Sequence, residues 1–340
     1  MTRQETQIIK GIALLMMLWL HLFSNVDHTL SLTNLIVLNN IPLASLIARA
    51  CPPVGFFVFC GGYGLYYTYR RGKDKHYLSR ISKLFIAYWL ITLVLIPLCI
   101  CFTDYSFALD WQSIILNITA LKTSWNYPCW FLFPYALLSL SYPILFSLFD
   151  KIRVRYVLTA TFILNFSIIV LLHLYGATYI NDRPYLSIPV SYLGFLFLFF
   201  CGAAFLRCDI VSTFRKQIKF ISGGVICVGQ IISLIILIIL KIISNSAADG
   251  GLYTIGIILL LLASPINPKN YLVIVLEKIG SHSMNMWMIH YLLYTYLFHE
   301  IIWGFQYPII IFVVLLLLSY MSSILFNIII KQIYKKLHLA

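Results

Sequence analysis

Residues Ile309–Ile330 read IIIFVVLLLLSYMSSILFNIII, an apolar run without a charged side chain. About 20 apolar residues are enough for a helix to cross the hydrocarbon core of a bilayer. Phe220–Leu240 is a second run of this kind. Over all 340 residues, 61% are hydrophobic and 10% are charged, and the mean hydropathy is +0.92. Because a soluble domain carries about 25% charged residues, we predict an all-α polytopic membrane protein.

The hydrophobic runs predict about ten membrane-spanning helices in a single domain of residues 1–340. Their expected ranges are 7–25, 48–69, 84–102, 129–149, 156–176, 186–206, 219–242, 252–265, 282–299 and 307–330. The eighth is short, and Asp110–Ala120 is too brief to cross, so we expect the latter to be re-entrant or interfacial on the outer side. The first run lacks a small-x-small cleavage pattern and is therefore interpreted as an anchor rather than a signal peptide.

The net charge of +13 is distributed unevenly along this plan. With a cytoplasmic N-terminus, the outer segments hold only Arg49, Lys122, Arg183 and Lys241, and the rest of the 24 Lys and Arg fall on the inner side. Such a bias is the usual orientation signal of membrane proteins, so we predict that both chain ends are cytoplasmic. The basic excess then reflects topology, and no nucleic-acid partner is expected. The eight cysteines are interpreted as small buried hydrophobes, with no metal site.

Two ionisable side chains, which are energetically costly inside a membrane, lie in the first predicted helix. Lys10 and His21 are eleven residues apart, which places them on nearly the same helix face and about 16 Å apart along the axis. Ionisable residues inside a membrane usually have a function. A buried neutral imidazole can accept a proton, so His21 is a candidate base. The alternative is that His21 hydrogen-bonds a neighbouring helix while Lys10 only sets the topology.

A glycine-rich segment and a basic loop follow. Pro52–Gly64 is dense in glycine, which permits either close helix packing or local unwinding beside a ligand. The inner loop Arg70–Lys83 holds more cations than orientation requires. Arg80 and Lys83 are three residues apart, near one face at the start of the third helix. They can hold the phosphates of a ligand, or they can contact anionic lipid headgroups.

Two further segments contain candidate residues. Trp130 lies among aromatic residues at the outer end of the fourth helix, where it can anchor the helix or stack against a sugar ring. In Glu277–His290, Ser281 or Ser283 is expected to cap the start of helix 282–299. His290 then lies about 12 Å from that start. It can share a chamber with His21 or make a separate interhelical hydrogen bond.

These segments together resemble the membrane acyltransferase 3 family, which transfers acyl groups to extracytoplasmic glycans. The similar motifs are Lys10…His21, Gly55–Tyr63, Arg80-Ile-Ser-Lys83, Trp130-Phe131-Leu132 and Gly280…His290, with Cys60 at the position of the family's Ser. Lys10 and Lys83 stand where the family more often has Arg, so they keep the charge but lose the planar fork. The soluble esterase-like extension frequent in the family is not expected in this chain.

The resemblance implies an O-acyltransferase that uses acetyl-CoA as co-substrate, without a bound cofactor, and a polysaccharide or lipid-linked glycan as acceptor. It implies His21 and His290 as catalytic residues, Lys10, Arg80 and Lys83 as donor-binding residues, and Trp130, Ser283 and Asn285 as substrate-binding residues. Ser283, Asn285 and His290 are also candidates for stabilising the oxyanion. Membrane lipid is an expected partner, a homodimer is compatible with the sequence, and the expected location is a bacterial cytoplasmic membrane. A polysaccharide flippase or small-molecule transporter is the alternative, and a glycan polymerase is a further one.

Overall fold

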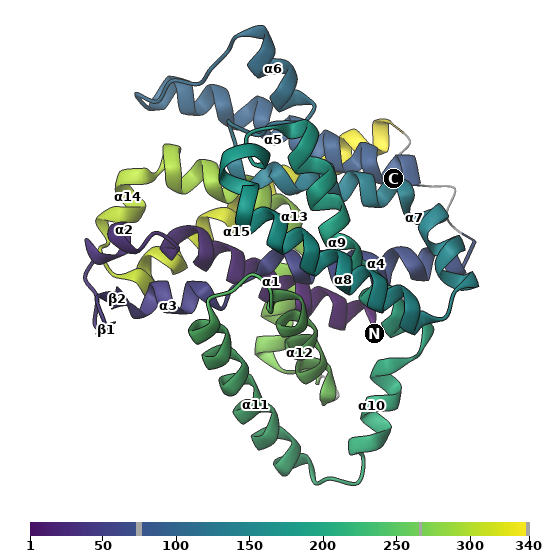
Figure 1. The fold of residues 1–340 in the computed structure, drawn as a ribbon. Coiled ribbons are helices and arrows are strands. Elements are labelled where there is room, and N and C mark those ends of the chain that lie inside the picture. The colour runs from purple at the N-terminus through teal and green to yellow at the C-terminus, as the bar shows by residue number, and fades with distance from the viewer. Residues whose placement is uncertain (73–76, 265–266, 338–340) are drawn as a thin grey trace. The chain divides into compact units, whose positions relative to one another are not determined.

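The computed structural model describes residues 1–72, 77–264 and 267–337, and it is helical almost throughout (Figure 1). The sheet within these residues is a short antiparallel hairpin of β1 (Val37–Leu38) and β2 (Ile41–Pro42). A 3₁₀-helix covers Tyr127–Phe131, and π-helices cover Gly176–Ile180 and Leu293–Leu297. The α-helices are α1 (Arg3–Phe23), α2 (Val26–Leu30), α3 (Leu43–Arg49), α4 (Pro53–Arg70), α5 (Tyr77–Phe102), α6 (Trp111–Ile118), α7 (Leu132–Lys151), α8 (Val154–Tyr175), α9 (Pro184–Arg207), α10 (Ile210–Ile218), α11 (Gly223–Ser244), α12 (Gly250–Ala263), α13 (Tyr271–Leu292), α14 (His299–Gly304) and α15 (Pro308–Lys336).

Eight helical segments of the described residues are long and apolar enough to cross a membrane. They are Arg3–Phe23, Leu43–Arg70, Leu78–Phe102, Tyr127–Lys151, Val154–Tyr175, Pro184–Arg207, Gly223–Ser244 and Pro308–Lys336. Helix α12 is apolar but shorter, as the sequence predicted for the eighth span. The helices confirm the all-α polytopic membrane fold. The number of ten crossings and the orientation stay predictions.

Contacts between Cα atoms divide the chain into two compact units. Unit 1 consists of Met1–Met16, Leu46–Asp74 and Ser141–Ser281. Unit 2 consists of Met17–Ser45, Lys75–Leu140 and His282–Ala340. The single domain expected from the sequence stays a prediction.

Local sequence explains where several helices begin. Pro occupies the start of α4, α9 and α15, where its missing N–H and fixed φ fit the first helical turn. Helix α6 begins after Asp110, whose carboxylate accepts a hydrogen bond from the Ser113 N–H at 3.0 Å. The segment Asp110–Ala120, expected to be re-entrant or interfacial, thus contains a short capped helix.

Helices α4 and α9 of unit 1 approach each other through paired glycines. A Cβ atom on Gly62 would lie 1.9 Å from the carbonyl oxygen of Phe199, and one on Gly202 would lie 2.1 Å from that of Phe59. No side chain fits in such a contact, so both positions require glycine. Close packing is therefore the role of Gly62, one of the two alternatives that its segment left open. Gly64, on the same helix, has open space beside it.

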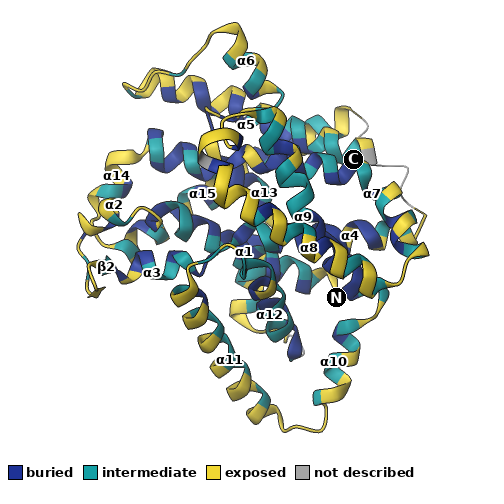
Figure 2. Cartoon of the chain, viewed as in Figure 1, coloured by how far each residue is buried: buried dark blue, intermediate teal, exposed yellow. Residues whose placement is uncertain are grey.

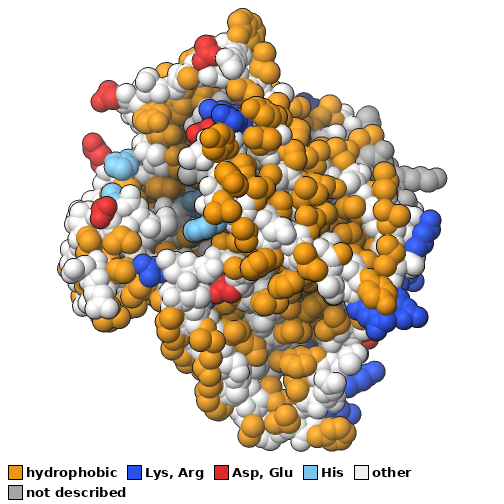
Figure 3. All heavy atoms as spheres, in the orientation of Figure 1, with side chains coloured by type: hydrophobic (Ala, Val, Ile, Leu, Met, Phe, Trp, Pro, Cys, Tyr) orange, Lys and Arg blue, Asp and Glu red, His pale blue; other side chains and the backbone are white. Residues whose placement is uncertain are grey.

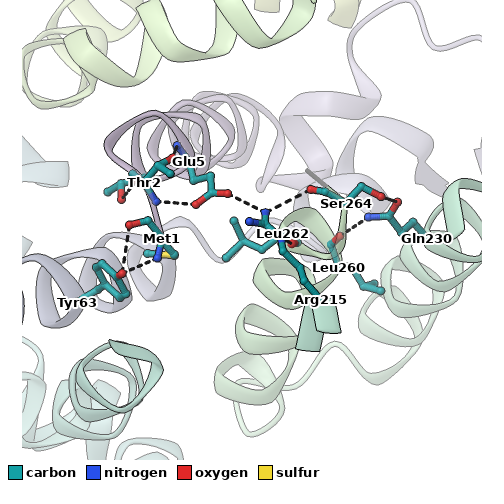
Figure 4. Close-up of polar contacts among 10 residues, drawn as sticks. Met1, Thr2, Glu5, Tyr63, Arg215, Gln230, Leu260, Leu262 and Ser264 are labelled. Atoms are coloured by element: carbon teal, nitrogen blue, oxygen red, sulfur yellow. Dashed lines mark hydrogen bonds and ion pairs between the residues drawn. The ribbon is translucent and has the colours of Figure 1, made fainter. Parts of the chain in front are cut away.

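A second glycine pair joins the first part of α1 to α13 within unit 1. A Cβ atom on Gly11 would lie 2.3 Å from the carbonyl oxygen of Leu276, and one on Gly280 would lie 1.8 Å from that of Gln7. Near the start of α1, the buried Glu5 forms a 2.7 Å ion pair with Arg215 of α10 (Figure 4). Polar contacts thus tie α10 to α1.

The same guanidinium extends this network toward α11 and α12. Arg215 Nε donates to the carbonyl oxygen of Leu262 at 2.8 Å, and a second nitrogen donates to that of Ser264 at 3.3 Å (Figure 4). The Ser264 hydroxyl donates to Gln230 Oε1 at 2.7 Å, and Gln230 Nε2 donates to the Leu260 carbonyl at 2.6 Å. Every polar side chain of this cluster has a partner, which offsets the cost of burying it.

The expected start of helix 282–299 is wrong. Helix α13 begins at Tyr271, so Ser281 and Ser283 lie inside it and do not cap its start. The Ser281 hydroxyl instead donates to the Lys278 carbonyl at 2.7 Å. The helix continues through its polar segment because Glu277 accepts a hydrogen bond from Gln4 at 2.9 Å. The 12 Å was counted from residue 282, which is not the start of the helix, and the depth of His290 in the bilayer stays a prediction.

The surface is hydrophobic where lipid is expected to cover it. Helix α11 is mostly exposed although it is strongly apolar, whereas much of α4 is buried (Figure 2). Hydrophobic side chains also cover much of the face shown in Figure 3. In water such exposure would be costly, so this surface fits a protein that is solvated by lipid tails.

Candidate functional site: a buried histidine pair in unit 2

The structure brings His21 and His290 together. His21 lies near the end of α1 and His290 lies on α13, and both belong to unit 2. Their ring centroids are 5.2 Å apart, with 41° between the ring planes. His290 is fully buried, with an exposed fraction of 0%, and His21 is half-buried. The two rings are therefore neighbours, and the shared chamber stays a prediction.

The backbone fixes the proton of His290. Its Nδ1 lies 2.8 Å from the carbonyl oxygen of Trp287 and 3.2 Å from that of Met286. A carbonyl oxygen only accepts hydrogen bonds, so Nδ1 carries the proton and Nε2 of the neutral ring carries a lone pair. That Nε2 is buried and has no hydrogen-bond partner within the described residues. An unpaired buried acceptor is costly, and such groups gather at functional sites.

Tyr294 connects the two histidines. Its hydroxyl donates to the backbone carbonyl of His21 at 3.4 Å, and its ring stacks beside His290 with centroids 6.2 Å apart. Its own carbonyl accepts a hydrogen bond from Trp303 Nε1 at 3.3 Å. Tyr294 belongs to the π-helix Leu293–Leu297, which directly follows α13. Single π-turns inside helices often occur at functional sites.

Asn126 forms a hydrogen bond to the part of α13 that contains His290. Its Nδ2 donates to the Met288 carbonyl at 2.6 Å, and its Oδ1 is buried without a partner within the described residues. Trp287 Nε1 donates to the Pro128 carbonyl at 2.9 Å. Sequence reasoning missed Asn126 because its segment was interpreted through its aromatic residues alone. The available signal was a polar residue within an apolar stretch.

An aromatic cluster includes residues that directly follow the π-helix in the sequence. The rings of His28 and Trp303 are 4.3 Å apart, and His299 Nδ1 lies 3.2 Å from the Tyr294 carbonyl. Partial burial, and then the neighbouring His299, lower the pKa of His28. The lowered pKa favours the neutral imidazole, whose ring packs edge-on against Trp303.

The candidate donor-binding residues occupy different units. Arg80 and Lys83 lie in the first two turns of α5 in unit 2, as the sequence predicted. The Lys83 ammonium lies over the Tyr334 ring, 5.7 Å from the ring centroid. The backbone carbonyl of Lys83 accepts a hydrogen bond from the Tyr334 hydroxyl. Lys10 is half-buried on α1 but belongs to unit 1. Lys73 and Lys75, which belong to the inner loop Arg70–Lys83, lie outside the described residues.

The candidate substrate-binding residues all belong to unit 2. Trp130 is partly exposed and packs against the Phe131 ring, with centroids 6.2 Å apart. Ser283 is buried, and Asn285 Nδ2 donates to Asn327 Oδ1 at 2.9 Å. Asn285 Oδ1 is buried without a partner within the described residues. The roles of all three residues stay predictions.

No group of three or more His, Cys, Asp or Glu side chains that could hold a metal ion occurs within residues 1–72, 77–264 and 267–337.

Fold and site define the class: a multi-pass helical membrane protein with two facing histidines inside it. The chain belongs to the acyltransferase 3 family, because the family model described as an acyltransferase domain matches residues 5–328. This match confirms the resemblance drawn from the sequence motifs, and it makes the protein a membrane acyltransferase. No curated protein and no solved structure matches the chain.

Proposed function

We propose that the protein transfers an acetyl group from cytoplasmic acetyl-CoA to a hydroxyl of an extracytoplasmic or lipid-linked polysaccharide. The observation that carries the proposal is the His21–His290 pair. In this pair, the buried Nε2 atom of His290 has no hydrogen-bond partner within the described residues. Acyl transfer to a hydroxyl needs a general base, and His21 can serve as that base when His290 Nε2 accepts its N–H. The family match supports the reaction class. The charge bias along the sequence supports a cytoplasmic donor and an outward-facing acceptor.

The reaction balances with one base. His21 takes the proton of the acceptor hydroxyl while the oxygen attacks the carbonyl carbon of the thioester. The tetrahedral intermediate then collapses, the C–S bond breaks, and the CoA sulfur leaves as a thiolate. The imidazolium of His21 returns its proton to that sulfur. No oxidant, reductant or metal enters, and the products are the acetyl ester and free CoA.

The two histidines have different roles in this proposal. His290 Nε2 can only accept a hydrogen bond, because Nδ1 holds the proton. It can accept the N–H of the neighbouring His21 ring, whose centroid is 5.2 Å away, after a small rotation of either ring. The other nitrogen of His21 then presents its lone pair to the hydroxyl. His290 thus sets the tautomer of the base, as the second residue of a catalytic pair does.

The donor-binding and substrate-binding residues complete the proposal as predictions from the sequence. Arg80 and Lys83 are proposed to hold phosphates of CoA near the cytoplasmic end of unit 2, and Lys10 is proposed for the same ligand class. Trp130, Ser283 and Asn285 are proposed to contact the substrate. The proposed location is the cytoplasmic membrane of a bacterium.

Labelled acetyl-CoA tests the proposal. Purified protein in lipid vesicles is mixed with the donor and a membrane glycan fraction, and label transferred to glycan is measured. His21→Ala should lower the rate about 10²–10⁴-fold, the usual contribution of a general base. A flippase or transporter would move substrate without consuming the donor, and a polymerase would lengthen the glycan without label.

The matched control is His173→Ala, which removes an exposed histidine on α8 of unit 1. It should transfer label at the wild-type rate. Both variants are compared by yield and by elution as a folded species in detergent. Full glycan labelling by folded His21→Ala protein would remove His21 from the mechanism.

A further inference from the structure

The second half of α15 in unit 2 has a polar face on an otherwise apolar helix. Residues 308–318 contain no polar side chain, whereas the residues that follow at intervals of three or four are Tyr320, Ser323, Asn327, Lys331 and Tyr334. Residues spaced in this way share one face of a helix. Ser323 is fully buried and Asn327 is half-buried. Part of this face therefore lies inside the protein, where its polar groups need partners.

Hydrogen bonds from this face fix the proton of His282 on α13. Asn285 Nδ2 donates to Asn327 Oδ1 at 2.9 Å, and Asn327 Nδ2 lies 2.9 Å from His282 Nδ1. An amide nitrogen only donates hydrogen bonds, so Nδ1 carries the lone pair and Nε2 of the neutral ring carries the proton. The Ser323 hydroxyl is 2.9 Å from the same Nδ1. His282 Nε2 has no hydrogen-bond partner within the described residues.

His282 and His290 therefore present opposite groups from one helix. His290 has its proton on Nδ1 and a lone pair on Nε2, whereas His282 offers an N–H from Nε2. The two residues are eight positions apart, which is about 12 Å along α13 and about 80° around it. Because Nδ1 of His282 faces α15, its Nε2–H points away from α15. A polar group in an apolar region is costly without a partner, so this N–H suits a ligand that brings an acceptor oxygen.

The polar face of α15 leads from His282 to a candidate phosphate-binding residue. The Tyr334 hydroxyl donates to the Lys83 carbonyl, and the Lys83 ammonium lies over the Tyr334 ring. Tyr334 follows Asn327 by seven residues on nearly the same face, about 10 Å along α15. His282 and all of these residues belong to unit 2. A cation thus lies at one end of the polar face that holds His282.

The histidine pair lies toward the opposite end of α15. Trp19, two residues before His21 on α1, packs against Phe312 of α15 with ring centroids 5.2 Å apart. Phe312 precedes Asn327 by 15 residues, about 22 Å along α15. Because Asn327 holds His282, that imidazole lies between Lys83 and the histidine pair.

An acyl-CoA molecule carries its groups in the same order. Its phosphates are followed by the pantetheine arm, which contains two amides and ends in the thioester. The carbonyl carbon of the amide farther from the sulfur is eight bonds from it, roughly 9 Å when the arm is extended. This length is comparable with the axial separation of His282 and His290. An amide carbonyl is also an uncharged acceptor, which costs less to bury than an ion.

We propose that His282 Nε2–H binds the carbonyl oxygen of this amide in the pantetheine arm of the donor. The proposal rests on the proposed function and specifies how the donor is held between its phosphates and its thioester. Asn327 and Asn285 act through His282 as positioning residues, because their hydrogen bonds set its tautomer. The contact holds the thioester end of the arm toward the histidine pair.

Truncated donors test this contact in the labelled-donor assay. Acetyl-CoA and S-acetylpantetheine contain both amides, whereas S-acetyl-N-acetylcysteamine keeps only the amide nearest the sulfur. His282→Phe should lower kcat/KM about fivefold for the first two donors, the usual effect of losing one neutral hydrogen bond, and should leave it unchanged for the third. His282→Gln should recover part of the loss, because its amide carries N–H groups. Equal loss with all three donors would indicate a structural role and overturn the proposal.

Two substitutions on α15 separate positioning from packing. Asn327→Leu removes the amide that fixes the His282 tautomer, so it should show the same preference among donors with a smaller loss. Ser322→Ala is the matched control, since this half-buried serine lies next to Ser323 and outside the network. It should use all three donors at wild-type rates. All variants are compared by elution as a folded species in detergent.

Binding of labelled acetyl-CoA separates this proposal from the proposed function. The full chain in phosphatidylethanolamine and phosphatidylglycerol vesicles is incubated with the donor alone, and bound label is measured. His282→Phe should weaken binding about fivefold relative to the wild type. That result without glycan acetylation would refute the acyltransferase function and leave the donor contact standing. Equal binding by wild-type and folded His282→Phe protein, or no binding to the wild type, would refute the contact.

Discussion

A buried imidazole whose Nδ1 is held by backbone carbonyls is a directional group. In His290 the carbonyls of Trp287 and Met286 fix the proton on one side of the ring, and the lone pair points from the other. The half-buried His21 lies beside it. The pair is therefore asymmetric, with the accessible ring suited to meet substrate and the deep ring suited to orient it.

This asymmetry predicts separate effects on kcat and KM. His290→Phe keeps a ring of similar size but removes both nitrogens, so His21 loses the group that sets its tautomer. We expect kcat to fall about 10–100-fold, the usual effect of losing an orienting partner, with little change in KM for acetyl-CoA. His290→Gln should recover part of the loss, because its amide oxygen can accept a hydrogen bond. A larger rise in KM than fall in kcat, measured in the labelled-donor assay, would contradict the orienting role.

The sequence singled out both histidines as candidate site residues, but it could not predict that their rings are in contact. An imidazole in an apolar helix is costly wherever it occurs, so His21 and His290 stand out one at a time. Whether the rings face each other depends on the rotation of α1 and α13, which no spacing within one helix determines. Asn126 and Tyr294 depend in the same way on tertiary contacts with backbone carbonyls.

At the scale of elements, two glycine pairs bring helices into backbone contact. The pattern Gly61-Gly62-Tyr63-Gly64 predicted that some glycine permits close approach. It could not show that Gly62 is in contact with α9 while Gly64 faces open space. The distinction depends on the partner helix, whose Gly202 lies far away in the sequence.

A pair of substitutions on one helix tests this packing. Gly62→Ala places a methyl group 1.9 Å from the Phe199 carbonyl oxygen, so α4 and α9 must separate. We expect a loss of about 1–3 kcal/mol in the free energy of unfolding, the usual cost of overpacking. Gly64→Ala should be neutral or stabilising by roughly 0.5–1 kcal/mol. Denaturant unfolding in detergent measures both, and equal stability of the two variants would contradict the close contact.

The wrong start of helix 282–299 also has an element-scale cause. Glu277 and Lys278 interrupt the apolar pattern, and that interruption predicted a loop. The helix passes through because Gln4 of α1 donates to Glu277 and Gly280 packs against Gln7. Tertiary partners of this kind override local polarity, and a single sequence does not reveal them.

At the scale of the whole molecule, hydropathy predicted the all-α membrane fold and the positions of most long helices. Those features depend on apolar length, which is a local property of the chain. The division into two units is not local, since each unit is assembled from three separate segments. The orientation stays a prediction from the distribution of Lys and Arg.

Cysteine labelling tests that orientation. In a chain whose exposed Cys101, Cys208 and Cys227 are replaced by serine, single cysteines are introduced as Ala247→Cys and Gln217→Cys, both at exposed positions. The first lies between α11 and α12, on the expected outer side. The second lies on α10, on the expected inner side.

A membrane-impermeant maleimide should label Ala247→Cys in intact cells and Gln217→Cys only after lysis. A permeant maleimide should label both and controls for reactivity. The reverse pattern would invert the orientation, and labelling of both in intact cells would place α10 and the α11–α12 turn on one side.

The ion pair between Glu5 and Arg215 also constrains how the chain is made. Its members are 210 residues apart, and at synthesis rates of about 5–20 residues per second the acid precedes its partner by roughly 10–40 s. During that interval α1 is already complete. Glu5 lies in the first turn of α1, where water at the membrane edge can solvate a carboxylate until the guanidinium arrives. An acid one or two turns deeper would spend the same interval unpaired in hydrocarbon, so the order of synthesis favours this position.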